Sequence, residues 1–382
     1  MSDQDHIGYF EADACDLNEF KTIIDRTQSE ADVPNAAKIE KDVPIYDMAK
    51  LRPALEQKES RREILIEWGR VFMSGSGVLV LKGAYADTGV IDEATKVYDS
   101  IIEAEKLGSG GGSDHFAAKG ANDRVWNSLQ KLCEHDPALY LRYFANTSIA
   151  AACEAWLGPN FQMTAQVNLV HPGGEAQQAH RDYHLGFQTP DVCGQYPAHV
   201  HDLSPTLTLQ GAIAHVDMPV ESGPTKLLPF SQTYRAGYAA WRRDDFRDLF
   251  EERCIQLPLA KGDALFFNPA LFHAAGANTS NNIHRMANLM QISSAFGRAL
   301  ESINRKEMCK ATYPHALQAQ KSGLLNPSEL RAAIACTAEG YPFSTNLDTD
   351  PPVGGLAPES QQAYFMRAMV EKPSSKEFNE HL

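Results

Sequence analysis

The feature that most constrains the fold is a series of short apolar segments in the second half of the chain, each ended by turn residues. Six segments after Pro159 have the alternating polarity and the residue types of β-strands. They are residues 161–170, 206–217, 225–230, 254–259, 263–268 and 283–295. Turn sequences such as HPGG at 171–174 and ESGP at 221–224 separate them. Several short strands joined in this way predict an antiparallel barrel or sandwich.

Helical periodicity dominates the sequence on both sides of this β region. Residues 61–73, 90–108 and 136–158 carry apolar side chains at helical spacing, and residues 78–85 are typical of a buried strand. Helical patterns return after Arg298. The predicted fold class is therefore mainly β with flanking helices.

Composition and periodicity divide the chain into three regions. Residues 1–45 are polar and acidic, and they predict an N-terminal extension. Residues 46–298 predict one domain in which helices precede the β core. Residues 299–382 predict a C-terminal helical extension, which would serve equally as a dimerisation surface or as a cover for the core. The sequence therefore leaves the oligomeric state open.

Charge and cysteine content exclude several classes of protein. The 49 acidic and 35 basic residues give a formal net charge of −14, which argues against a nucleic-acid or membrane partner. The seven cysteines contain no CxxC pair and are scattered along the chain, as in proteins of reducing compartments. No apolar run approaches the length of a membrane span, and the first residues have no secretory or transit pattern. We therefore expect a cytoplasmic globular protein.

The densest group of chemically active side chains is HRDYH at residues 180–184. In an extended segment residues i and i+2 face the same side, so His180 and Asp182 are expected to point together into the barrel. One imidazole and one carboxylate supply two of the three ligands in the facial triad of non-haem Fe(II) oxygenases. A third ligand must then be a histidine from another strand.

Three later histidines are candidates for the third ligand. His215 lies in the middle of a strand among apolar neighbours, as a core residue would. His284 has no glycine turn behind it. His273 follows the strand at 263–268 and precedes a glycine turn, which predicts a place at the barrel rim. We therefore select His273.

Arg285 strengthens the choice of His273. It lies 12 residues further on, with the turn AGANTSNN between the two, so it is expected on the neighbouring strand with its side chain inside the barrel. A guanidinium buried beside a metal needs an anion, and its planar fork matches a carboxylate bidentately. The distal carboxylate of 2-oxoglutarate fits this requirement.

These motifs together resemble the phytanoyl-CoA dioxygenase family. The resemblance rests on HRD at 180–182, ESGPTKLLPFSQ at 221–232, KGDALFFNPALFHAAGANTSNNIHR at 261–285 and the HPGG turn. It is strong over 160–298 and loose over 75–160. It implies a double-stranded β-helix core of the jelly-roll or cupin-like type. It also implies an oxidoreductase that uses Fe(II), 2-oxoglutarate and O2, and that hydroxylates a small organic substrate with release of succinate and CO2.

Two positions refine what the resemblance implies. Family members with a small residue in place of the aspartate can become halogenases, so Asp182 favours hydroxylation or desaturation. The residue two positions after the distal histidine often carries a hydroxyl group that touches the co-substrate. Here that residue is Ala275, so the contact must come from elsewhere.

Further residues are weaker candidates for the site. Gln166 and Asn168 share one strand face, and either bind the carboxylates of 2-oxoglutarate or form hydrogen bonds inside the barrel. His184 would share the face of Asp182 and could act as a catalytic residue on the open side of the metal. Lys119 and Arg124 are more typical of solvated surface charge. The glycine-rich stretch 108–113 is a candidate lid.

Two other functions compete with the oxygenase hypothesis. His199 and His201 form an HxH pair, the spacing that cupin-type metalloenzymes use without 2-oxoglutarate. No glutamate stands at the distance that a cupin site requires, and the pair is better explained as surface or lid histidines. A non-catalytic binding protein on the same fold is the other alternative, although it has no need of all four site residues. The substrate cannot be identified from the sequence.

Overall fold

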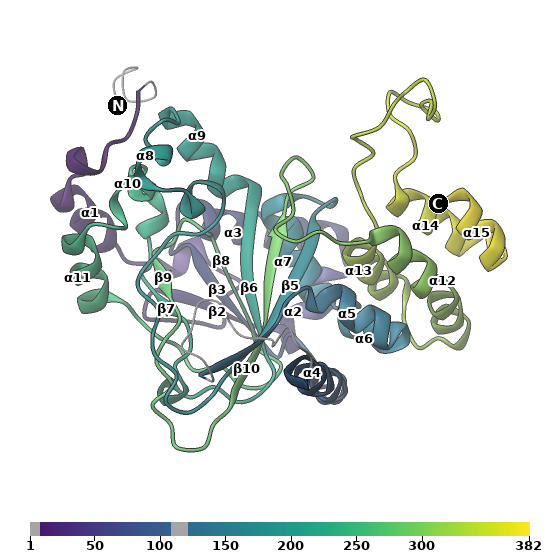
Figure 1. The fold of residues 1–382 in the computed structure, drawn as a ribbon, viewed down its shortest axis with the longest axis horizontal. Coiled ribbons are helices and arrows are strands. Elements are labelled where there is room, and N and C mark those ends of the chain that lie inside the picture. Colours follow the sequence, from purple (N-terminus) through teal and green to yellow (C-terminus); the bar gives the residue numbers. More distant parts are fainter. Residues whose placement is uncertain (1–7, 108–120) are drawn as a thin grey trace.

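A computed structural model describes residues 8–107 and 121–382 of the chain (Figure 1). The glycine-rich stretch at 108–113 and Lys119 lie outside the described residues. Within the described part, no helix has the combination of length and apolar character that crossing a bilayer requires.

A mixed sheet of eight strands forms the centre of the molecule (Figure 1). In spatial order the strands are β1 (Lys38–Glu40), β2 (Val43–Asp47), β3 (Val78–Lys82), β8 (Ala264–Phe267), β6 (Thr208–Ala214), β10 (Arg285–Ser293), β5 (Gln162–Val170) and β4 (Asn122–Val125). Only β2 and β3 pair in parallel, and all other neighbours are antiparallel. β2 spans the boundary that was predicted at residue 45, so the chain before it is joined to the sheet through β1.

A second, smaller sheet is built from β7 (Lys226–Leu227) and β9 (His273–Ala274). Isolated bridges extend it on both sides, from His180 to His273 and from Leu227 to Ile255. Four of the predicted strand segments, 161–170, 206–217, 263–268 and 283–295, correspond to regular strands of the large sheet. The segments at 225–230 and 254–259 contribute only β7 and two isolated bridges to the β-structure.

Helices occupy 47% of the chain, so the prediction of a mainly β protein is not confirmed. Among the described residues, the α-helices before β5 are α1 (Leu17–Ile24), α2 (Met48–Leu55), α3 (Lys58–Met73), α4 (Gly89–Leu107), α5 (Ser128–His135), α6 (Pro137–Phe144) and α7 (Thr147–Leu157). Four lie within the β region: α8 (Pro190–Cys193), α9 (Ala198–Leu203), α10 (Gly237–Ala240) and α11 (Asp244–Arg253). Four follow it: α12 (Arg305–Ser322), α13 (Pro327–Thr337), α14 (Gln361–Glu371) and α15 (Ser375–His381).

The predicted helix at 136–158 is two helices, α6 and α7. Asp136 caps α6 as expected, because its side chain accepts a hydrogen bond from the backbone N–H of Leu139. Asn146 then accepts hydrogen bonds from the backbone N–H groups of Ser148 and Ile149 and starts α7. The segment 136–158 has one continuous apolar periodicity, but the capping side chain of Asn146 divides it into two helices.

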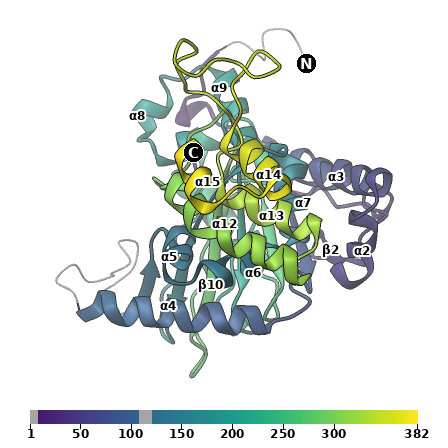
Figure 2. The ribbon, with the colours of Figure 1, turned by 90° about the vertical axis from the view of Figure 1, so that its right-hand side faces the viewer.

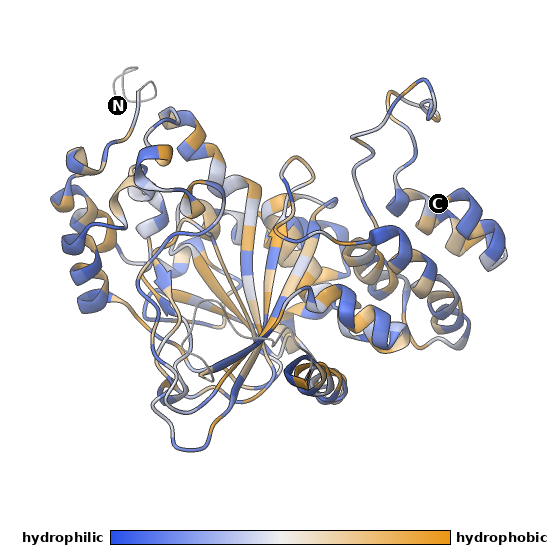
Figure 3. Ribbon diagram, in the orientation of Figure 1, coloured by the Kyte–Doolittle hydropathy of each residue, from blue (hydrophilic) through white to orange (hydrophobic). Residues whose placement is uncertain are grey.

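The large sheet has one face toward the helices and the other toward a cavity. Alternate residues of β10, namely Met286, Met290 and Ile292, belong to the main hydrophobic core together with α3 to α7. The residues between them face the cavity: Arg285, Ala287, Leu289 and Gln291. The period of two along an extended strand therefore separates the packed side of the sheet from the functional side. In Figure 3 the central strands are largely apolar.

The C-terminal helices continue the main core. Figure 2 shows α12 to α15 stacked beside α5, α6 and α7. The rings of Tyr313 and Phe378 stack with their centroids 3.9 Å apart. Arg305 donates hydrogen bonds to the carbonyl oxygens of Met163 in β5 and Cys336 in α13. These contacts join the last quarter of the chain to the sheet.

His215 belongs to the core, and burial lowers the pKa of its imidazole from 6.5 to about 3. Its ring nitrogens lie 2.7 Å from the hydroxyl of Tyr143 and 2.9 Å from that of Thr95. The unfolded chain therefore binds a proton at this residue between pH 6.5 and 3, while the folded chain does not. We predict that this difference lowers the free energy of unfolding by about 2 kcal/mol between pH 7 and 5.

Urea unfolding of the wild type and of His215→Gln across this pH range measures the contribution. The difference in unfolding free energy between the two proteins should change by about 2 kcal/mol, because only the wild type carries the titrating ring. A difference that is the same at pH 7 and pH 5 would show that His215 does not make the fold sensitive to acid.

Candidate metal centre

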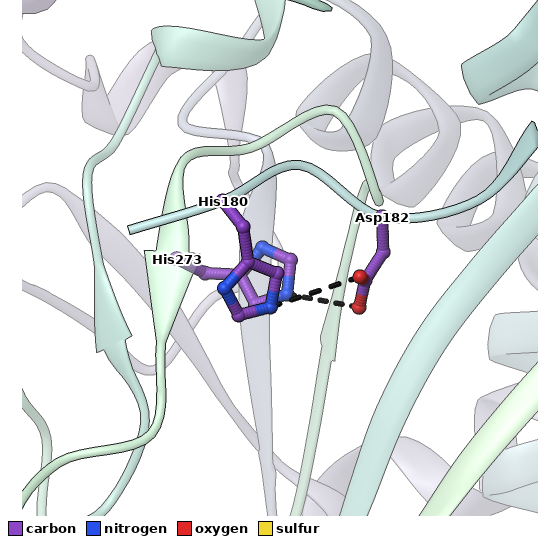
Figure 4. A group of neighbouring side chains, drawn as sticks. All are labelled: His180, Asp182 and His273. Carbon is purple, nitrogen blue, oxygen red and sulfur yellow. Dashed lines mark hydrogen bonds and ion pairs between the residues drawn. The ribbon is translucent and has the colours of Figure 1, made fainter. Parts of the chain in front are cut away.

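Three side chains converge at the edge of the small sheet: His180, Asp182 and His273 (Figure 4). One ligand atom from each lies within 4.8 Å of the other two. Nε2 of His273 is 3.3 Å from Oδ2 of Asp182, and Nε2 of His180 is 3.7 Å from Oδ1. The structure therefore brings together the three residues that the sequence selected.

Backbone hydrogen bonds place these side chains. The N–H of His180 donates to the carbonyl oxygen of His273 at 3.0 Å, and the reverse bond is 3.1 Å long. The N–H of Asp182 donates to the carbonyl oxygen of Pro269. This antiparallel bridge sets the two imidazoles side by side, with ring centroids 4.4 Å apart.

The hydrogen bonds of the two imidazoles indicate which nitrogen carries the proton. Nδ1 of His180 lies 2.8 Å from the carbonyl oxygen of Gln178, and Nδ1 of His273 lies 2.8 Å from that of Leu271. A carbonyl oxygen only accepts, so each Nδ1 is the protonated nitrogen and each Nε2 has a free lone pair. Two lone pairs facing a carboxylate repel one another unless a cation lies among them, so the donor set fits a metal ion.

The carboxyl group of Asp182 is held in its ionised form. Burial by itself raises its pKa, but without a metal ion the protonated forms of the His180 and His273 imidazoles, together with a hydrogen bond from Gln210, outweigh burial and hold the pKa well below its usual range. Nε2 of Gln210 donates to Oδ2 of Asp182 at 2.6 Å and lies 3.3 Å from Oε1 of Gln291. Neither glutamine was predicted as a site residue, although each is a polar residue of a strand with alternating polarity, Gln210 in β6 and Gln291 in β10.

Arg181 anchors the chain between the two ligand residues. Its side chain is 2% exposed and lies between the rings of Tyr238 and Phe272, 5.1 Å from each ring centre. It donates hydrogen bonds to the carbonyl oxygens of Ser231 and Tyr234 at 2.6 and 2.9 Å. Burial lowers its pKa to about 10, which leaves it charged at neutral pH. The alternation of side chains thus turns His180 and Asp182 into the cavity and Arg181 into the packed layer behind them.

A cavity of about 870 Å³ lies between the two sheets, and the three convergent residues form part of its wall. Arg285, Gln166 and Asn168 line it as well. The four cavity-facing residues of β10 begin with Arg285 and end with Gln291. Arg285 stands at one end of this row and Gln291, beside Gln210 and Asp182, at the other, so the guanidinium and the convergent residues belong to the wall of one cavity.

Arg285 is a buried guanidinium without an acidic partner in the described part of the chain. The residue is 7% exposed, and burial lowers its pKa to about 10, so it remains charged at neutral pH. Its Nη1 lies 3.3 Å from the carbonyl oxygen of Ser222 and 3.4 Å from that of Gly276. Two long bonds to neutral oxygens compensate a buried charge poorly. This end of the cavity therefore suits an anion.

Gln166 and Asn168 point into the cavity from β5. Nη1 of Arg124 donates to Oε1 of Gln166 at 2.9 Å. Nε2 of Gln166 and Oδ1 of Asn168 are buried without a hydrogen-bond partner in the described chain. The expectation that Arg124 is a solvated surface residue is wrong, because Arg124 pairs with Asn168 across the β4–β5 ladder and shares its inward face.

His184 lies outside the set of residues that line the cavity. Its Nδ1 is 3.2 Å from the hydroxyl of Ser204. The expectation that it shares the face of Asp182 assumed an extended chain, but Tyr183 and His184 both have positive φ, at 64° and 39°. The chain turns there into a short 3-10 helix at His184–Phe187, which directs His184 away from the convergent residues.

The other histidines considered from the sequence lie elsewhere. His284 has its Nδ1 2.8 Å from Nδ1 of His171, on the outer side of the sheet edge. His199 and His201 lie on α9 rather than in a loop. Residues two apart on a helix point in different directions, and only His201 is buried. The HxH pair therefore does not converge as a metal site would.

Comparison with known proteins places these features in a family. A family model described as phytanoyl-CoA dioxygenase matches residues 73–287, which is more than half of the chain. The dioxygenase andF of Emericella variicolor is 27% identical over 143 residues, which cover 35% of this chain and 43% of that relative. The dioxygenase trt7 of Aspergillus terreus is 26% identical over 132 residues, which cover 34% and 39%. The chain thus spans less than half the length of the curated relatives it matches.

Solved structures also resemble this chain. The epimerase SnoN in complex with Fe3+, alpha ketoglutarate and nogalamycin RO matches with a TM-score of 0.42 and 20% sequence identity. The match covers 61% of this chain and 85% of the SnoN chain.

Close packing around Arg181 gives a test of how this segment is held. A Cβ atom added to Gly186 would press against the backbone carbonyl of Arg181, whereas one added to Gly355 meets nothing within 4 Å. We predict that Gly186→Ala lowers the free energy of unfolding by about 1–3 kcal/mol. The matched variant Gly355→Ala should change it by less than about 0.5 kcal/mol. Urea unfolding of both variants gives the comparison, and equal stabilities would contradict the packing described here.

Proposed function

Because the chain belongs to the phytanoyl-CoA dioxygenase family, we propose that it is an Fe(II)- and 2-oxoglutarate-dependent dioxygenase that oxidises a small organic molecule. Enzymes of this family use Fe(II), 2-oxoglutarate and O2. The observation that carries the proposal is a pairing of two groups in one cavity. Three lone-pair donors converge within 4.8 Å of one another on its wall, and a buried arginine that has no acidic partner among the described residues lines the same cavity.

In this proposal His180, Asp182 and His273 hold the iron. Nε2 of each imidazole and the carboxylate of Asp182 are the ligands, since the Nδ1 atoms are engaged with backbone carbonyls. Gln210 keeps the carboxylate oriented through its hydrogen bond to Oδ2. Three protein ligands leave coordination positions for the co-substrate and O2. With iron and 2-oxoglutarate bound, the site supplies oxidising chemistry, and succinate and CO2 are the co-products.

Arg285 binds the distal carboxylate of 2-oxoglutarate in this proposal. It supplies a charged donor in the same cavity as the three ligands, and a carboxylate can accept two parallel bonds from a guanidinium. Gln166 and Asn168 lie on the same face of the sheet; the free Nε2 of Gln166 serves as an additional donor to the co-substrate, whereas Asn168 would donate through its Nδ2, because its free Oδ1 only accepts. His184 has no part in this arrangement, because it does not line the cavity.

The finer features of the fold and reaction are also proposals. Strands β8, β6, β10 and β5 of the large sheet face the small sheet, and we propose that together they form a double-stranded β-helix within a catalytic domain at 46–298. The aspartate ligand supports hydroxylation of an unactivated C–H bond, with desaturation as the alternative outcome. All seven cysteines are free, which supports a reducing compartment such as the cytoplasm.

An anaerobic Fe(II) titration with and without 2-oxoglutarate tests the iron site. We expect a visible iron-to-keto-acid charge-transfer band only when both are present. The band should be lost in His180→Ala and Asp182→Ala, because each removes one of three ligands. The matched variant His199→Ala removes an exposed histidine of α9 and should keep the band. A full band in Asp182→Ala would contradict the assignment of the ligands.

Titration with 2-oxoglutarate at saturating Fe(II) tests Arg285. Loss of a charge-assisted hydrogen bond costs about 1.5–3 kcal/mol, so Arg285→Gln should weaken 2-oxoglutarate binding by roughly 10- to 150-fold. Fe(II) affinity should be unchanged, because Arg285 is not a ligand. If Fe(II) binds but 2-oxoglutarate never produces the band, a metalloenzyme of the cupin type becomes the better explanation.

A further inference from the structure

Large apolar side chains lie at the opening of the cavity. Phe187 and Leu300 line the cavity and yet are 55% and 37% exposed, which places them at its mouth. Trp126 and Trp241 line the same cavity. Trp126 and Leu300 follow strands β4 and β10 of the large sheet, and Phe187 and Trp241 lie on the side of the small sheet. Apolar side chains thus flank the mouth on both sides.

Arg247 of α11 also lines the cavity. Its guanidinium lies 5.7 Å from the ring centre of Trp241. Its nearest carboxylate is that of Asp244, 4.0 Å away and 95% exposed, which is a weak ion pair in water. The Nε atom of Arg247 is buried without a hydrogen-bond partner in the described chain.

Arg247 differs from the other arginines of the cavity wall in the hydrogen bonding of its guanidinium. Arg124 donates to Gln166, Arg181 donates to two backbone carbonyls, and Arg285 contacts two more. Within the described part of the chain, no side-chain nitrogen of Arg247 makes a hydrogen bond within the protein. Its neighbour Arg242 instead stacks on Trp241 at 3.8 Å and donates to the carbonyl oxygen of Gln188 at 2.6 Å. Arg242 therefore holds the mouth together, while Arg247 remains available to a ligand.

The charge of the cavity wall is opposite to that of the whole chain. The chain has 49 acidic and 35 basic residues. Among the described residues that line the cavity there are two carboxylates and four arginines. They are Glu175, Asp182, Arg124, Arg181, Arg247 and Arg285. Iron and Arg285 would together balance Asp182 and the dianionic co-substrate, and the Arg181 guanidinium lies in the packed layer. Arg124 and Arg247 then face the single carboxylate of Glu175, which leaves positive charge for a second anion.

We infer that the substrate is an apolar organic acid whose carboxylate binds Arg247 while its carbon skeleton lies against Trp126, Phe187, Trp241 and Leu300. This inference rests on the proposed function, because it assigns Arg285 to the co-substrate. A carboxylate matches a single guanidinium, which offers two parallel donors. Contact with Arg247 at the mouth leaves the apolar end of the molecule directed inward, toward Asp182 and the two histidines.

Binding of matched acid and amide probes tests this inference. The probes are naphthalene-1-acetate with naphthalene-1-acetamide, and 4-phenylbutyrate with 4-phenylbutyramide. Their affinities are measured calorimetrically for protein loaded anaerobically with Fe(II) and 2-oxoglutarate. We expect each acid to bind at least tenfold more tightly than its amide. In Arg247→Gln the ratio should fall to about one, whereas Arg247→Lys should retain part of the preference.

The control variant Arg331→Gln removes the same charge from an exposed position on α13 and should leave the ratio unchanged. Equal binding of acid and amide by the wild type, no binding of either acid, or an unchanged ratio in Arg247→Gln would overturn the inference. Preferential binding of 1-naphthyl phosphate over the carboxylates would also overturn it.

The charge-transfer band separates this inference from the proposed function. If the band forms normally in the wild type and in Arg247→Gln, failure of the acid preference contradicts only the substrate class. If no band forms in the wild type, the oxygenase proposal fails. The same probe pairs are then measured on the apoprotein, where an acid preference lost in Arg247→Gln would still support an acid-binding mouth.

Discussion

The antiparallel bridge between His180 and His273 is the interaction on which the site depends. Its two backbone hydrogen bonds join the loop after β5 to β9, although the residues are 93 positions apart in sequence. Each histidine then bonds through Nδ1 to a carbonyl oxygen two residues before it. The same local arrangement therefore occurs twice and directs both Nε2 atoms at Asp182. A register slip of one residue would turn one imidazole to the opposite face of the sheet.

The large sheet connects this bridge to the rest of the protein. Along β10, alternate side chains belong either to the core shared with the helices or to the wall of the cavity. The helices outside the β region therefore hold the cavity in place without lining most of it. Arg181 acts similarly on the other side, because its buried guanidinium fixes the chain between two ligand residues. The convergent residues are thus supported by packed structure from both sheets.

The arginines show how one residue type can serve different purposes in one cavity. Arg181 satisfies backbone carbonyls, Arg285 is buried without an acidic partner, and Arg247 makes no hydrogen bond within the described protein. Burial and hydrogen bonding, rather than charge alone, distinguish these situations. The net negative charge of the chain predicts weak attraction for anions at its surface, yet the cavity wall carries mainly positive side chains. A local arrangement can therefore reverse what the overall charge suggests.

Several features of this protein were determined by the sequence alone. Hydrophobic patterns located five strands of the large sheet, namely β3, β5, β6, β8 and β10, and the helices α3, α4, α6 and α7, the last two as one helix. The HxD spacing with a histidine before a glycine turn identified the three residues that converge. The share of helix, the inward position of Arg124, the turn that removes His184 and the Gln210–Asp182 hydrogen bond were decided only by the tertiary structure. Local patterns report how side chains alternate within one segment. They do not report which strand edges become neighbours or where the backbone adopts a positive φ, because long-range packing selects both.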